Sequence, residues 1–323
     1  MLRSLFVYLS KAVWARQIVT GWPMTRRMAG RFVAGDTLED AIQAIQVLNA
    51  QGINASLDHL GESTTNATEA IQATEDILVA LDAIAASQVR ANVSIKLTQV
   101  GLKLGVPLCA QNLYRISRHA AELGNFIRVD MEDTPVTQIT LDLVRQTCQR
   151  LDEENTPSRV GVVIQSYLFR SEADTHDLVQ ARIPVRLCKG AYQEPARLAF
   201  PKKADVDANY DRLAGILLDA AVTQGRRLSP DGKYPPLPAL ATDDARRIEF
   251  AKNYASKIGL SKDCLEFQML YGIRRDLQLQ LTTTGYPVRV YVPYGTHWYP
   301  YFMRRLGERP ANVWFIISNF FRR

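Results

Sequence analysis

The sequence predicts an α/β fold in which parallel strands and helices alternate to form a distorted (β/α)8 barrel of the TIM type, with extra helices at both ends. Eight short runs are rich in apolar and β-branched residues, at 53–60, 91–100, 125–132, 160–168, 183–191, 238–242, 265–270 and 288–293. Helical patterns separate most of these runs, for example at 69–87, 110–123, 136–153 and 172–181. The main alternative is an open, doubly wound sheet. No GxGxxG motif follows the first run, so the usual dinucleotide fingerprint of that fold is missing.

We expect an N-terminal helical segment followed by a single barrel domain. Residues 1–35 mix basic and apolar side chains in the pattern of one or two amphipathic helices, which would cap the barrel. Residues 36–323 hold the barrel and the C-terminal helices, and no linker among them is long enough to separate two domains. Asp36 is the predicted N-cap of the first barrel helix, whose apolar positions repeat from Leu38 to Leu48 and which ends at Gly52.

Composition and charge narrow the class of protein. The chain has 323 residues, of which 47% are hydrophobic and 22% charged, which excludes a disordered chain and a polytopic membrane protein. The 39 basic and 33 acidic residues give a net charge of +6 without a basic block, so we expect no nucleic-acid partner.

Cysteine use and targeting signals point to the cytoplasm. None of the four cysteines stands at metal-ligand spacing, and the acidic cluster at 130–133 lies among cations, so we predict no metal site. Scattered thiols are typical of proteins in a reducing compartment. Residues 5–9 are too short an apolar run for a signal peptide, and no run reaches the roughly 20 apolar residues of a spanning helix. We therefore expect a cytoplasmic protein.

Charged residues stand at the ends of the predicted strands, where the active sites of (β/α)8 barrels lie. Lys96 lies in the second run, Asp130 in the third and Arg186 in the fifth. Charged groups inside a barrel are costly unless they are paired or functional. Each residue alone could be half of a structural ion pair, and Lys96 could form a Schiff base as in aldolases. Their recurrence at corresponding strand ends favours an active site.

A second group of candidates lies near the C-terminus. Pro300 can begin a helix, because its missing N–H would be unpaired in the first turn anyway. Tyr301, Arg304 and Arg305 then share one helix face, since they are three and four residues apart. Paired guanidinium groups beside a tyrosine suit a carboxylate or phosphate ligand. The alternative is an ordinary solvated basic face.

These residues belong to motifs that resemble the monofunctional bacterial proline dehydrogenases. The resemblance covers about residues 32–313 and depends on several short motifs in the correct order. The motifs are FVAG at 32–35, LDHLGE at 57–62, SIKL at 94–97, VDME at 129–132, VRLCKGAY at 185–192, EFQ at 266–268 and the run 291–305. Each motif is weak alone, and their combination is specific.

The resemblance implies a role for individual residues. Asp130 and Arg186 match the active-site pair beside the flavin, while the predicted substrate-binding residues are Lys96, Tyr291, Tyr301, Arg304 and Arg305. The predicted flavin contacts are Met131, Gln165, Lys189, Gly190, Ala191, Thr242 and Asp243. Asp243 replaces a histidine that is common in the family, and a carboxylate cannot donate a hydrogen bond as imidazole can. Asp58 and Glu62 match acidic residues near the pocket mouth, where Glu62 would pair with Arg304 as a gate.

The activity implied by the resemblance is the oxidation of L-proline to Δ1-pyrroline-5-carboxylate with non-covalently bound FAD, the first step of proline degradation to glutamate. Quinone is the expected electron acceptor. The apolar residues 313–323 end in two arginines and suggest a peripheral membrane contact, although a helix docked on the barrel is the simpler alternative. Other interpretations are a flavin dehydrogenase for hydroxyproline or pipecolate, and a non-catalytic flavin-binding barrel.

Overall fold

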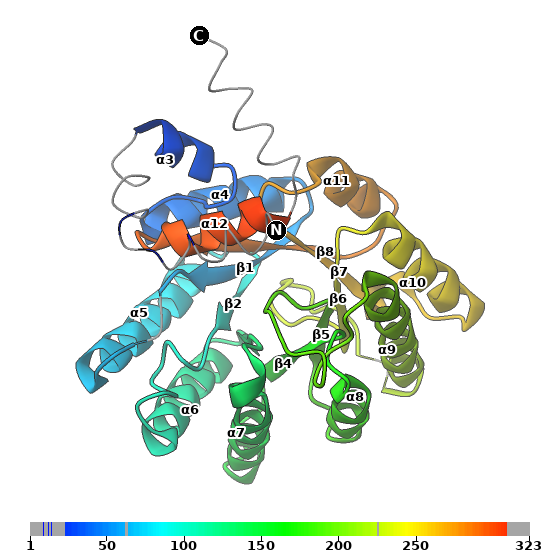
Figure 1. The fold of residues 1–323 in the computed structure, drawn as a ribbon, viewed down its shortest axis with the longest axis horizontal. Helices are drawn as coiled ribbons and strands as arrows, with labels where there is room; N and C mark the ends of the chain where they lie inside the picture. The colour runs from blue at the N-terminus through cyan, green and yellow to red at the C-terminus, as the bar shows by residue number, and fades with distance from the viewer. Residues whose placement is uncertain are drawn as a thin grey trace.

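A closed barrel of eight parallel strands forms the centre of the molecule (Figure 1). The structure, a computed structural model, describes residues 23–61, 64–224 and 226–308, together with Leu9, Ala12 and Trp14. Each strand pairs with the next along the chain, and β8 closes the ring by pairing with β1 in parallel. The strands are β1 Asn54–His59, β2 Ala91–Ile95, β3 Ile127–Val129, β4 Val160–Gln165, β5 Val185–Cys188, β6 Pro238–Ala241, β7 Glu266–Leu270 and β8 Val288–Tyr294. The predicted barrel fold is confirmed.

Helices surround the barrel and connect its strands (Figure 1). They are α3 Pro23–Ala29, α4 Leu38–Ala50, α5 Ala67–Ala86, α6 Val106–Glu122, α7 Thr134–Glu153, α8 Ser171–Gln180, α9 Lys203–Gln224, α10 Ala245–Lys257, the 3-10 helix η1 Lys262–Cys264, α11 Arg275–Thr283 and α12 Trp298–Glu308. Apolar side chains on the outside of the strands pack against the apolar faces of these helices in one large core. The residues that face the helices are therefore apolar, whereas the alternate residues, such as Asn54, Ser56 and Asp58 of β1, face the barrel interior and are polar.

Several predicted boundaries were wrong by a few residues. The second, third and fourth strands end earlier than expected, and β3 has only three residues. After β2 and β4 the chain turns at once, since the N–H of Gln99 donates to the carbonyl oxygen of Lys96 and that of Leu168 to the carbonyl oxygen of Gln165. Helix α4 is capped by Thr37 rather than Asp36, because Thr37 and Asp40 form a capping box. Helix α12 begins at Trp298, so Pro300 lies inside its first turn, where no backbone acceptor is needed.

The interior of the barrel is polar and is closed at its N-terminal end. Residues 226–237, between α9 and β6, run beneath the strands. Arg289 of β8 donates to the carbonyl oxygen of Gly232 at 2.6 Å, and Asn92 of β2 donates to that of Lys233 at 3.0 Å. Tyr234 packs edge-on against Phe126, with ring centroids 5.1 Å apart. We refer to this end of the interior as the barrel floor.

Helices α3 and α12 pack together over one side of the barrel (Figure 1). They form a second apolar cluster in which Phe32, Trp298 and Phe302 are buried. Most of the predicted N-terminal cap, residues 1–35, lies outside the described residues, so the division of the chain at residue 35 stays a prediction. Among the described helices, none combines the length and the apolar character needed to cross a membrane.

Candidate active site

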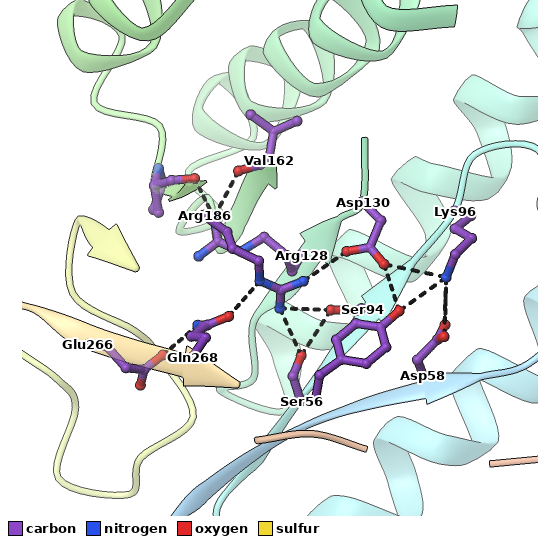
Figure 2. Close-up of polar contacts among 12 residues, drawn as sticks. Ser56, Asp58, Ser94, Lys96, Arg128, Asp130, Val162, Arg186, Glu266 and Gln268 are labelled. Carbon is purple, nitrogen blue, oxygen red and sulfur yellow. Dashed lines mark hydrogen bonds and ion pairs between the residues drawn. The ribbon is translucent and has the colours of Figure 1, made fainter. Parts of the chain in front are cut away.

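Five side chains, each from a different strand or the segment that follows it, converge at the C-terminal ends of the strands. Asp58 lies in β1, Lys96 follows β2, Asp130 follows β3, Arg186 lies in β5 and Tyr291 lies in β8. Side chains two residues apart on a strand share a face, and this alternation turns all five into the barrel. Figure 2 shows Lys96, Asp130 and Arg186 joined by a continuous chain of polar contacts. We refer to this group as the mouth cluster.

Lys96 is held by two carboxylates and a phenol. Its Nζ lies 3.1 Å from both carboxylate oxygens of Asp58, 3.4 Å from Oδ2 of Asp130 and 3.1 Å from the hydroxyl of Tyr291. Burial opposes the charge on Lys96, but Asp58 and Asp130 outweigh it and raise the pKa of the ammonium group above its ordinary value. Lys96 therefore stays protonated, and a Schiff base, which needs a neutral amine, is not supported.

Asp130 links the two cations of the cluster. Its Oδ1 accepts from Nη1 of Arg186 at 2.8 Å, and its Oδ2 accepts from the hydroxyl of Tyr291 at 2.7 Å. Burial and the carboxylate of Asp130 raise the pKa of Tyr291 far above the ordinary tyrosine value. Tyr291 thus remains a hydrogen-bond donor, and Asp130 orients both Arg186 and Lys96.

Arg186 is bonded along most of its guanidinium edge. Nε donates to Oε1 of Gln268 at 2.5 Å, and Nη2 donates to the hydroxyls of Ser56 and Ser94 at 3.2 and 3.0 Å. Together with the bond to Asp130, these contacts use four of its five N–H groups within the described part of the chain. The remaining N–H, on Nη1, is available to a ligand at the strand ends.

Asp58 is more deeply placed than the resemblance implied. Its side chain is 1% exposed, so it lies beneath Lys96 and not at the pocket mouth. Burial raises the pKa of its carboxyl group, while Lys96 opposes the shift. The predicted partner of Arg304, Glu62, lies outside the described residues, and the proposed gate stays a prediction.

The residues predicted to contact the flavin surround the same end of the barrel. Met131 directly follows Asp130, and Gln165, at the end of β4, donates to the carbonyl oxygen of Glu132 at 2.8 Å. The remaining residues follow β5 and β6, and they are Lys189, Gly190, Ala191, Thr242 and Asp243. The structure brings these residues to one rim of the barrel, and their contact with a flavin stays a prediction.

Gly190 shows why this rim needs a small residue. Its φ of +112° is a backbone conformation that favours glycine, and a Cβ there would lie 2.2 Å from the ring of Tyr167. The backbone at the end of β5 can therefore pass close to the ring.

The sequence reasoning missed the partners of Lys189. Its Nζ contacts Asp207 of α9 at 2.5 Å and Asp244, the N-cap of α10, at 2.7 Å. Arg247 also contacts Asp207, at 3.4 Å. No sequence spacing could reveal these pairs, because they join three separate elements. Ser56 and Ser94 were missed as well, although their alternation with Asp58 and Lys96 could have placed them in the barrel.

Helix α12 brings the second predicted group to the rim. Arg305 lies over the ring of Tyr301, 5.2 Å from its centroid, as the helical spacing predicted. Tyr301 is buried and Arg304 is exposed. Tyr192 is partly exposed, and the charges of Lys96 and Arg304 both oppose the rise of its pKa that desolvation and Glu132 cause.

The closed parallel barrel and the charged cluster at its C-terminal strand ends define an enzyme of the (β/α)8 class. The chain belongs to the proline dehydrogenase family, whose pattern matches residues 41–317. The family resemblance drawn from the sequence motifs is confirmed. The protein is an oxidoreductase of proline catabolism.

Relatives of known function cover nearly the whole chain. It is 43% identical to proline dehydrogenase of Deinococcus radiodurans over 90% of this chain and 89% of that protein. It is 37% identical to proline dehydrogenase 2 of Bacillus subtilis over 97% of this chain and 96% of that protein. Proline dehydrogenase 1 of Bacillus subtilis is 38% identical, with both chains covered completely.

Solved structures support the fold. Proline utilization A from Bdellovibrio bacteriovorus, inactivated by N-propargylglycine, superposes with a TM-score of 0.76 and 26% identity. The match covers 87% of this chain and 32% of that one, so the present chain spans about a third of the larger protein. Proline utilization A from Bradyrhizobium japonicum gives a TM-score of 0.71 at 23% identity.

Proposed function

We propose that the protein oxidises L-proline to Δ1-pyrroline-5-carboxylate with non-covalently bound FAD and passes the electrons to quinone. The observation that carries this proposal is the mouth cluster, in which Lys96, Asp130, Arg186 and Tyr291 meet at the strand ends. FAD, when bound, accepts the hydride that proline loses.

The rim offers groups that fit an anionic flavin nucleotide. Arg186 keeps one N–H on Nη1 for a ligand, and Gly190 lets the backbone of the same rim pass close to the ring of Tyr167. Lys189, next to Gly190, is partly exposed, but Asp207 and Asp244 already balance its charge, so we assign to it a hydrogen bond to the cofactor rather than a charge contact. Met131, Gln165, Ala191, Thr242 and Asp243 complete the proposed cofactor site. Arg186 supplies the positive charge that favours a reduced, negatively charged cofactor.

The substrate carboxylate has three candidate cations. Arg304 and Arg305 offer planar donor forks, and Tyr301 lies against Arg305. The charge of Lys96 is already balanced by Asp58 and Asp130, so we assign to Lys96 an orienting hydrogen bond rather than the main charge contact. The arginines fix the carboxylate and position the ring for loss of hydride, while Asp130 holds Arg186 in place.

The decisive experiment uses the full-length protein purified with FAD. We expect a yellow protein that L-proline bleaches anaerobically, with a product that o-aminobenzaldehyde traps as its dihydroquinazolinium adduct. Faster bleaching by hydroxyproline or pipecolate would change the substrate to that amino acid. A flavin that none of the three amino acids reduces would instead indicate a non-catalytic barrel.

Electron transfer to quinone requires access to a membrane. We propose a peripheral contact with the cytoplasmic face of the membrane through residues 313–323, which lie outside the described residues. Co-sedimentation with anionic liposomes should fall when residues 315–323 are deleted. Unchanged liposome binding by a folded deletion variant would exclude this role, and oxidation of proline with a soluble quinone tests the acceptor separately.

A further inference from the structure

A row of buried polar side chains extends from Arg186 away from the mouth. Nε of Arg186 donates to Oε1 of Gln268 at 2.5 Å, and Nε2 of Gln268 donates to Oε1 of Glu266 at 2.6 Å. Arg289 closes the row with two bonds to Glu266, at 2.8 and 3.0 Å. Figure 2 shows Gln268 standing between Glu266 and Arg186. The row thus joins the mouth cluster to the barrel floor.

The two hydrogen-bonding neighbours of Gln268, Arg186 and Glu266, fix the orientation of its amide group. A guanidinium group can only donate hydrogen bonds, and an ionised carboxylate can only accept them. The amide must therefore turn its oxygen to Arg186 and its nitrogen to Glu266. Residues 266 and 268 are two apart on β7, so both side chains point into the barrel.

Glu266 is a firm anchor for this amide. Glu266 and Arg289 are both fully buried, and Arg289 also donates to the carbonyl oxygens of Ala55 and Gly232 at 2.6 Å each. A carboxylate held by a bidentate arginine on the floor has little freedom to move. Because Gln268 bonds to Glu266, its amide oxygen is held in a fixed position opposite Arg186. The amide is neutral, so it adds no further negative charge beside Arg186.

The bond to Nε decides how the guanidinium plane is turned. Ser56 and Ser94 hold Nη2 and Asp130 holds Nη1, but both serine hydroxyls can rotate and Asp130 also serves Lys96 and Tyr291. The acceptor at Nε is therefore the contact that fixes the rotation of the plane. That rotation determines where the remaining N–H of Nη1 points.

We propose that Gln268 is a positioning residue for the reaction, which holds the guanidinium of Arg186 in the orientation that the cofactor requires. This inference rests on the proposed function of Arg186. Gln268 acts through Arg186 and needs no contact with the substrate or the cofactor.

The test compares two buried glutamines. Gln268→Met keeps the volume of the side chain but removes the acceptor at Nε. The matched control is Gln278→Met in α11, because Gln278 is equally buried and its amide donates to the carbonyl oxygens of Ile273 and Leu270, at 2.7 and 3.4 Å. We expect Gln268→Met to slow anaerobic flavin reduction at saturating L-proline by about tenfold or more, with KM changed less than threefold.

A third variant separates positioning from packing. Gln268→Glu keeps an oxygen opposite Nε of Arg186, so we expect it to reduce faster than Gln268→Met. If Gln268 only fills space, the order reverses, because the apolar isostere is tolerated and a second carboxylate beside Glu266 is not. The midpoint potential of the bound flavin gives a readout independent of turnover. It should become more negative in Gln268→Met and stay unchanged in Gln278→Met.

The outcomes are distinguishable. A wild-type protein that L-proline does not reduce overturns the proposed function itself. A wild-type protein that is reduced, beside a Gln268→Met variant with normal rate and potential, overturns the positioning role alone. If Gln268→Met fails to fold, Gln268→Asn replaces it, since the shorter amide cannot bridge Arg186 and Glu266, and the same two outcomes apply.

Discussion

The mouth and the floor of the barrel are both built from buried charges, but they satisfy those charges differently. On the floor, Arg289 bonds to Glu266 and to two backbone carbonyl groups, and both side chains are 0% exposed. At the mouth, Lys96 and Asp130 bond mainly to other side chains and remain 22% and 14% exposed. The floor is anchored to the backbone, whereas the mouth is a network of side chains that a ligand can reach.

This difference separates structural from functional charges. Removing one partner of a buried ion pair leaves an uncompensated charge and destabilises the fold. At the mouth, Asp130 keeps Tyr291 and Lys96 when one partner is lost, so its charge is still partly satisfied. Substitutions on the floor should therefore act mainly on stability, with catalysis affected through Glu266 and Gln268, and substitutions at the mouth should act mainly on catalysis.

The largest effect is expected on the floor. Arg289→Met leaves Glu266 buried without its cation, so the free energy of unfolding should fall by about 3–5 kcal/mol in chemical denaturation. The double variant Arg289→Met with Glu266→Met removes both charges of the pair and should recover part of that loss, because Glu266 also faces the buried Arg128 and accepts a hydrogen bond from Gln268. A single variant as stable as the wild type would show that the floor is not held by this pair.

At the mouth we expect a large effect on the reaction rate and a small effect on stability. Arg186→Met should slow anaerobic flavin reduction by L-proline about 100-fold, because a donor at the site of developing charge is lost. Stopped-flow spectroscopy measures the rate, and denaturation measures the accompanying change in stability, which should be smaller than that of Arg289→Met. A wild-type rate at saturating proline would remove Arg186 from the catalytic residues.

A smaller effect is expected on helix α12. Arg305→Met should raise the KM for L-proline about tenfold to 100-fold, since one charge-assisted hydrogen bond is worth about 1.5–3 kcal/mol. Flavin content and the reduction rate at saturating proline should change little. Steady-state kinetics decide the assignment, and an unchanged KM rules out Arg305 as a carboxylate ligand.

The smallest effect concerns Asp211, a carboxyl group on helix α9. Burial raises the pKa of Asp211 to about 6, with Arg247 opposing the shift. The folded state therefore binds the proton of Asp211 more tightly than the unfolded chain does. The contribution of this group to the free energy of unfolding is fully present below about pH 4 and is lost as the pH rises through about 6. Solvent screening limits the effect to under about 1 kcal/mol. Asp211→Asn should flatten the pH dependence of Tm in that range, and an unaltered profile would contradict the shift.

The sequence by itself determined the barrel and the identity of the family. Eight short β-rich runs separated by helical patterns predict parallel strands, because a helix between two strands brings the chain back to start the next strand in the same direction. The motifs around Lys96, Asp130 and Arg186 were sufficient to place the chain among the proline dehydrogenases. The helical spacing of Tyr301 and Arg305 also predicted their contact correctly.

Only the tertiary structure decided which charges are paired. The partners of Lys96 come from β1, β8 and the segment after β3, and those of Lys189 come from α9 and the N-terminus of α10. These residues are up to 195 positions apart, and their contact depends on the closure of β8 onto β1 and on the register of the strands. Local patterns report which face a side chain occupies. They cannot report which opposite strand it meets, because that is set by the packing of the whole barrel.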